Sequence, residues 1–89
     1  MSWQIRVSSH AEKYYLRLDK RRRERIRKEL TDLADFADPA EHPQVKPLAG
    51  ELRGFYRLRV GGYRAIFALL PEEHVIAVVN LAPRGGAYK

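Results

Sequence analysis

Three arginines alternate with apolar residues in the segment 55–70, on both sides of a Gly61-Gly62 pair. Two adjacent glycines suit the two-residue turn of a β-hairpin, because glycine takes a positive φ at little steric cost. A turn of that length pairs Arg59 with Arg64 across the two strands. Like charges directly opposite each other destabilise a sheet. The pair therefore indicates a bound anion, and a phosphodiester backbone is the commonest candidate.

The same register divides the predicted hairpin into two faces. Its other cross-strand pairs are Val60–Tyr63, Leu58–Ala65 and Arg57–Ile66. One face carries all three arginines, Arg57, Arg59 and Arg64, together with the apolar residues Phe55, Ile66, Ala68 and Leu70. The opposite face carries only apolar and aromatic residues: Tyr56, Leu58, Val60, Tyr63, Ala65, Phe67 and Leu69. This division is expected of a strand pair that lies on a hydrophobic core. The face with the arginines is then expected to be exposed, and its mixture of apolar and basic residues suits a protein partner.

A second basic segment, Lys20–Lys28, holds seven basic residues and one acidic residue among nine. It is interpreted either as the solvated face of an amphipathic helix or as a ridge that contacts phosphates. The candidate RNA-binding residues are Arg21, Arg22, Arg23 and Arg25 in this segment and Arg53 ahead of the hairpin. Both interpretations remain open from the sequence.

The end of the chain carries two further candidates. Arg84 directly follows the last predicted strand, and Tyr88 is separated from it by two glycines that allow the chain to fold back. The alternative for Tyr88 is a packed or frayed aromatic residue. Other catalytic chemistry has little support, because the chain has no cysteine and its three histidines are far apart in the sequence. No metal site and no small-molecule cofactor are expected.

The elements that must position these residues follow from hydrophobic periodicity. Residues 3–7 alternate as in a strand. Ser8 or Ser9 then caps a helix that ends near Asp19, and a second helix follows almost immediately. The apolar stripes of the two helices are Ala11, Tyr14, Tyr15 and Leu18, then Ile26, Leu30, Leu33, Ala34 and Ala37, before Pro39 stops the second helix.

Residues 38–50 form a proline-rich loop in this prediction, which leads into the basic hairpin. A turn at 71–73 precedes a third consecutive strand, Val75–Leu81. The order strand, helix, helix, strand, strand, strand predicts an α+β fold with the helices on one face of a mostly antiparallel sheet. Residues 1–89 are expected to form a single domain.

Composition favours a globular domain with a polyanionic partner. The chain is 45% hydrophobic and 31% charged, and it carries a net charge of +6. Its longest apolar run is far shorter than a membrane span needs, and no secretory signal is visible. A cytoplasmic location is therefore expected, with no membrane partner.

These features together resemble the RelE/ParE superfamily of bacterial toxin–antitoxin systems, over essentially the whole chain. The resemblance rests on the element order, on LRGFYRLRVGGYRAIF, on VIAVVNLAPR and on a late tyrosine. Its most specific part is Gly54, Tyr56, Arg57, Arg59, the glycine turn and Tyr63-Arg64 ahead of an apolar strand. The RelE-like branch is favoured. The resemblance implies a toxin that cuts messenger RNA on the ribosome without metal, and a cognate antitoxin protein as partner.

The resemblance also implies roles for five residues. Arg57 and Arg59 match two strand positions that are often lysine, Arg64 matches an arginine, and Arg84 and Tyr88 match a second arginine and the late tyrosine. The chain departs from the pattern in three ways: arginine replaces lysine at two positions, the spacing between Arg84 and Tyr88 is short for the RelE type, and the sequence stops at Lys89 where relatives often continue into a helix. Two alternatives remain, a ParE-like inhibitor of DNA gyrase and a non-catalytic toxin that acts as a binding module.

Overall fold

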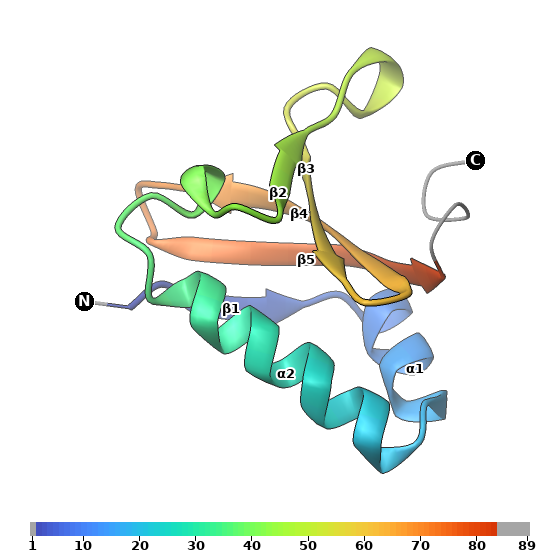
Figure 1. Ribbon diagram of the computed structural model, residues 1–89. Helices are drawn as coiled ribbons and strands as arrows, with labels where there is room; N and C mark the ends of the chain where they lie inside the picture. Colours follow the sequence, from blue (N-terminus) through green and yellow to red (C-terminus); the bar gives the residue numbers. More distant parts are fainter. Residues whose placement is uncertain (1, 84–89) are drawn as a thin grey trace.

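The structure, a computed structural model, describes residues 2–83 and is a two-layer α+β domain (Figure 1). The element order is β1 (Gln4–Val7), α1 (Ser9–Arg17), α2 (Lys20–Ala34), η1 (Pro39–Glu41), β2 (Val45–Pro47), η2 (Gly50–Leu52), β3 (Tyr56–Val60), β4 (Tyr63–Leu70) and β5 (Val75–Pro83). The five strands form one sheet in the order β1-β5-β4-β3-β2. β1 is parallel to β5, and the other neighbours are antiparallel. The predicted fold class is confirmed.

Both helices begin at capping side chains. Ser8 Oγ accepts a hydrogen bond from the backbone N–H of Ala11 (3.1 Å), and Asp19 Oδ1 accepts one from the N–H of Arg22 (2.9 Å). The prediction of Ser8 as a cap is therefore confirmed. None of the helices within residues 2–83 is long and apolar enough to cross a membrane.

The second helix is shorter than predicted. It ends at Ala34 instead of continuing to Pro39, and Ala37 is exposed beyond its end. The Ala34 carbonyl accepts the backbone N–H of Trp3 (2.7 Å), and the Ala37 carbonyl accepts the Trp3 indole N–H (3.3 Å). Pro39 has no N–H with which to extend the helix. The two N–H groups of Trp3 therefore donate to carbonyls that the end of the helix leaves without a helical partner.

The prediction of a continuous loop over residues 38–50 is wrong. This segment contains the 3₁₀ turn η1 and the edge strand β2, and η2 starts at its end. β2 pairs with β3 through Val45–Leu58, Lys46–Arg57 and Pro47–Tyr56. A strand of three residues is too short to show a periodic pattern, and a proline within it is tolerated only because the strand lies at an edge.

The hairpin register is confirmed at every predicted pair, including Arg59 opposite Arg64. Gly61 takes a positive φ of 56°, as the first position of a type II′ turn requires, whereas Gly62 does not. The turn therefore places the three arginines of the hairpin on the face that does not carry Leu58 and Ala65, both fully buried.

A β-bulge in β5 changes which residues face the helices. Ile66 pairs with Asn80 and Phe67 pairs with Val78, so Val79 has no partner on β4. Because side chains alternate along a strand, this extra residue brings Leu81 into the core and puts Asn80 on the opposite face. The bulge also meets the start of α1, where Ser8 Oγ donates to the Val79 carbonyl (3.0 Å).

The hydrophobic core lies between the helices and one face of the sheet. Its best-buried members come from both layers: Ala11, Ile26, Leu33, Leu58, Ala65, Phe67, Ile76 and Val78. The helices α1 and α2 both lie below the sheet in Figure 1, so neither of them covers the other face. We call this second face the open face, and β2, β3, β4 and β5 all contribute to it.

Candidate nucleic-acid interface

Four cationic residues lie close together on the open face. The register places Lys46 beside Arg57, and Arg59 beside Arg64, on the three neighbouring strands β2, β3 and β4. Neighbouring strands are only about 4.8 Å apart, so the four charges share a small area. Lys46 and Arg59 are exposed, while Arg57 and Arg64 are half-buried. The predicted grouping of Arg57, Arg59 and Arg64 is therefore present in the fold.

This arrangement favours an anionic ligand. Three ion pairs are described within residues 2–83, Arg6–Glu73, Lys20–Glu24 and Arg22–Asp19, and none involves Lys46, Arg57 or Arg59. Adjacent cations repel one another, and a phosphate bound between them would relieve that repulsion. The planar guanidinium of arginine can hold two phosphate oxygens at once.

Two residues of this face were missed by the sequence analysis. Lys46 was placed in a loop, and only its pairing with Arg57 puts it on the face. Asn80 reaches the face through the bulge, where it lies opposite Ile66. The alternation of buried Val45 and exposed Lys46 is a weak sequence signal for the strand that carries Lys46. The bulge that places Asn80 interrupts the alternation of side chains, so no alternating pattern in the sequence predicts it.

The prediction that Ile66 is exposed on this face is wrong, because Ile66 is only 2% exposed. It occupies the central strand, with Arg57 on one side and Asn80 on the other in the register. The stems of long polar side chains can cover apolar surface in this way. Leu70, at the end of the strand, is 36% exposed as expected.

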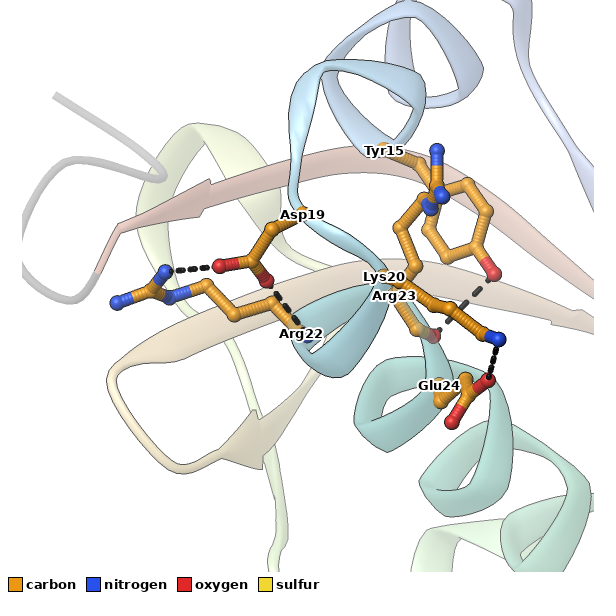
Figure 2. Close-up of polar contacts among 6 residues, drawn as sticks. All are labelled: Tyr15, Asp19, Lys20, Arg22, Arg23 and Glu24. Carbon is orange, nitrogen blue, oxygen red and sulfur yellow. Dashed lines mark hydrogen bonds and ion pairs between the residues drawn. The ribbon is translucent and has the colours of Figure 1, made fainter.

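The basic segment of α2 does not form a uniform ridge. Arg22 is bound to Asp19, with 2.7 Å between Nη1 and Oδ2, and Lys20 pairs with Glu24 on the other side of the helix (Figure 2). The carbonyl of Arg23 accepts the hydroxyl of Tyr15 (3.2 Å), on the side that faces α1 (Figure 2). The first turns of α2 therefore point their cations in several directions.

Three arginines of this segment approach the hairpin turn. Arg21 and Arg25 line a hollow together with Arg22 and the Gly61-Gly62 turn. Arg53 lies elsewhere, directly after η2 in the β2–β3 connection, and this connection projects away from α1 and α2 (Figure 1). The structure thus brings Arg21, Arg22 and Arg25 near the hairpin turn, and it does not bring Arg53 to the same place.

The other candidates in the sequence are Arg84, Tyr88 and the histidines. Arg84 and Tyr88 lie outside the described residues. His42 Nδ1 accepts the N–H of Gln44 (3.0 Å), and His74 stacks on Trp3 with 4.3 Å between ring centroids, so these histidines have local partners. Within residues 2–83 no three histidine, aspartate or glutamate side chains come together as metal ligands would.

Tyrosines near the hairpin turn face the core. Tyr14 and Tyr63 pack edge to face with 6.3 Å between their ring centroids. Burial raises the pKa of Tyr14, and the neighbouring Tyr63 raises it further. Tyr14 therefore ionises less readily than an ordinary phenol, and its position on the helix side removes it from the open face.

Asp19 gives a testable pH dependence. The backbone N–H of Arg22, followed by its guanidinium charge, holds the pKa of Asp19 below the ordinary value of 3.8. A lowered folded-state pKa contributes stability above the unfolded-state value, and this stability is lost as the pH falls through the folded-state value. Asp19→Ala should therefore lower the thermal midpoint at neutral pH, with a difference that shrinks below pH 3.8. Circular dichroism melts across the acidic range measure this.

Asp32→Ala is the matched control, because Asp32 is an exposed acidic residue of the same helix that does not cap it. It should shift the thermal midpoint less than Asp19→Ala at neutral pH. An Asp19→Ala difference that stays constant from neutral to strongly acidic solution would contradict the capping explanation.

The sequence and the fold both have clear relatives. The sequence model described as the ParE toxin of the type II toxin–antitoxin system parDE matches residues 5–88. The toxin RelE of Mycobacterium tuberculosis is 31% identical over 48 residues, which are 54% of this chain and 50% of that protein. The match thus spans about half the length of this curated relative.

Two solved structures share the fold over nearly their whole length. The archaeal RelE–RelB complex from Pyrococcus horikoshii has a chain that is 29% identical with a TM-score of 0.77, over 98% of this chain and 100% of that one. The toxin–antitoxin complex RelBE2 from Mycobacterium tuberculosis gives a TM-score of 0.82 at 22% identity, over 94% and 93% of the two chains. The chain therefore belongs to the ParE toxin family of type II toxin–antitoxin systems, in the RelE/ParE superfamily, and within that superfamily it is RelE-like.

Proposed function

We propose that this toxin is a ribosome-dependent endoribonuclease that cleaves messenger RNA without a metal ion. The observation that supports this most is the grouping of Lys46, Arg57, Arg59 and Arg64 on the open face. A phosphodiester backbone matches their charge, their hydrogen-bonding capacity and their spacing on adjacent strands. The likeness to RelE proteins supports the same activity.

The proposed reaction is an internal transfer at phosphorus. The 2′-oxygen forms a bond to the adjacent phosphorus, the bond from phosphorus to the 5′-oxygen breaks, and the products are a cyclic phosphate and a free 5′-hydroxyl. One proton leaves the 2′-hydroxyl and one is given to the 5′-oxygen. The phosphoryl oxygens gain negative charge in between, and arginines fixed in a sheet can stabilise that charge without reorganising.

Arginine cannot also be the base, because its pKa above about 12 keeps it protonated at neutral pH. Tyr88 is the proposed base, and Arg84, four residues earlier in the sequence, is the cation that would help it to ionise or would bind the scissile phosphate. Ionising an ordinary phenol at pH 7 costs about 4 kcal/mol, so a neighbouring positive charge is needed. This weak base makes the reaction depend on a well-oriented substrate, which the ribosome would supply.

The proposal includes two macromolecular partners, an antitoxin and the ribosome. Several structural relatives were solved as complexes of RelE with RelB. We expect a cognate antitoxin to bind this chain likewise, in the cytoplasm. The ribosome is the second partner, and the net charge of +6 favours association with its RNA. Among the basic residues away from the open face, Arg23 and Arg53 are proposed as peripheral RNA contacts.

Primer-extension mapping of a message on purified ribosomes tests the function. The purified toxin should produce discrete cuts within ribosome-bound message and should leave the same message largely intact when ribosomes are omitted. Tyr88→Phe should reduce cutting if the phenol is the base. Uniformly intact message in both samples would exclude the nuclease.

The ParE family match makes gyrase inhibition the second candidate function. A supercoiling assay with purified DNA gyrase distinguishes it from the nuclease. Loss of supercoiling together with intact ribosome-bound message would select the second candidate, and unaffected supercoiling would exclude it.

A further inference from the structure

Two hollows meet at the turn of the basic hairpin. The first, of about 500 Å³, lies between the start of α2 and the turn, and Arg21, Arg25 and Gly62 are among its lining residues. The second, of about 420 Å³, lies on the β2 side of the turn, with Arg59 and Glu29 in its lining. Both hollows include Arg25 and Gly61, so Arg25 stands on their shared boundary.

The guanidinium of Arg25 lies face-on to the turn. A β-carbon added at Gly61 would lie 3.2 Å from Arg25 Cζ and 3.4 Å from both Nη atoms. Near-equal distances to the central carbon and to both nitrogens mean that the approach is onto the flat face of the group. Because the N–H bonds of a guanidinium lie in its plane, they point sideways and remain available to a ligand. Glycine at position 61 leaves the space that this contact requires.

The charges around the two hollows sum to a modest positive value. Their lining contains four cations and two carboxylates, namely Arg21, Arg22, Arg25, Arg59, Asp19 and Glu29. Four minus two leaves +2, and Asp19 is already bound to Arg22. The remaining charge suits one or two phosphates, whose oxygens the planar guanidinium of arginine can hold in pairs.

The hollows are continuous with the open face through one residue. Arg59 lines the second hollow and also pairs with Arg64 on the open face. A line of cations therefore runs from Arg57 and Arg64 through Arg59 to Arg25, around the end of the hairpin. A single RNA strand bound on the open face would continue along this line.

We propose that the hollows beside the hairpin turn form a second phosphate subsite, which holds a phosphate of the substrate strand that is not cleaved. Arg25 is its central ligand and Arg59 links it to the cleavage site. This inference rests on the proposed nuclease function for the identity of the strand. The subsite would fix the register of the message beside the scissile phosphate and would contribute binding rather than proton transfer.

Salt-dependent binding of the full-length protein to RNA tests the subsite. The probe is a fluorescent single-stranded RNA of about 12 nucleotides, a length within the range that single-strand sites cover. Its 2′-positions are methylated, so it cannot be cleaved. Each neutralised phosphate contributes about 0.7 to the slope of log affinity against log salt for single strands. Arg25→Gln should lower that slope by about 0.7, and Arg25→Lys should largely retain it.

Arg27→Gln is the matched control. Arg27 is two residues further along the same helix, is exposed, and lines a different hollow with Ile5 and Thr31. It removes the same charge, yet it should leave the salt slope unchanged. Equal slopes for Arg25→Gln and Arg27→Gln, in variants whose thermal melts match that of the wild type, would overturn the proposal.

Glu29→Gln gives a prediction of opposite sign, because it removes a carboxylate from the lining. It should tighten RNA binding, and weaker binding would count against the subsite. Poly-glutamate is the comparison ligand. If Arg25→Gln lowered the slope for poly-glutamate and not for RNA, the hollow would belong to an acidic protein and the proposal would be overturned.

The outcome is separable from that of the nuclease proposal. The binding measurement uses no ribosome and an RNA that cannot react. It therefore tests the subsite even if the cleavage assay finds the message intact. Cleavage of ribosome-bound message combined with an unchanged slope for Arg25→Gln would overturn the subsite alone.

Discussion

Arg64→Ala is expected to slow cleavage of ribosome-bound message by about 10²- to 10³-fold, the range found when one preorganised donor to a developing oxyanion is removed. Arg64 lies on the central strand β4, directly opposite Arg59, and is half-buried. A guanidinium held in this way does not need to reorganise when negative charge develops on the phosphoryl oxygens. The loss should therefore appear mainly in the rate of the chemical step and less in the binding of message.

The comparison of Arg64 with its neighbours makes the prediction specific. Arg59 is exposed, so water screens its charge more strongly and Arg59→Ala should have a smaller effect on the rate. Arg64→Lys keeps the charge and loses the planar fork, so its rate should fall between those of the wild type and of Arg64→Ala. Single-turnover cleavage on saturating ribosomes is the measurement that separates the rate from binding.

Arg17→Ala is the control for a general loss of positive charge. Arg17 is exposed at the end of α1, on the helix side of the domain. The Arg17→Ala variant should therefore cleave message at the wild-type rate. If Arg64→Ala and Arg17→Ala both cleaved at the wild-type rate, with matching thermal melts, Arg64 would not belong to the site. A tenfold loss in both would indicate that only the overall charge matters.

The sequence predicts the hairpin well because its determinants are local. The glycine turn and the alternating residues on either side of it are enough to fix which residues pair, and all predicted pairs are found. The helix cap at Ser8 is equally local. Interactions between neighbouring residues along the chain therefore account for the part of the candidate site formed by Arg57, Arg59 and Arg64.

The rest of the open face depends on contacts between distant segments. β2 is defined only by its pairing with β3, which brings Lys46 to Arg57. The bulge at Val79 is defined by the shift between Ile66–Asn80 and Phe67–Val78, and residue types alone do not reveal it. β1 likewise joins the sheet by pairing with β5 from the other end of the chain. Long-range pairing has no period in the sequence, so these features required the fold.

Phe67→Ala should lower the free energy of unfolding by about 3 to 5 kcal/mol, the usual loss when a buried phenylalanine is truncated. Phe67 is completely buried on the helix side of β4, and its ring stacks on Tyr56 with 5.6 Å between centroids. A domain of this size is stable by roughly 5 to 13 kcal/mol, so the variant loses a large share of its stability. Urea unfolding followed by circular dichroism measures the change, with unfolding midpoints compared at equal slope.

Phe36→Ala is the matched control, because Phe36 is 37% exposed beyond the end of α2. Its loss should be clearly smaller, since less apolar surface returns to water and no closed cavity is formed. Similar losses for the two variants would show that the core does not lie where the structure places it. At low temperature, where Phe67→Ala remains folded, its cleavage rate should stay well above that of Arg64→Ala. The core residue holds β4 against the helices, whereas the charge that stabilises the reaction comes from the opposite face of the same strand.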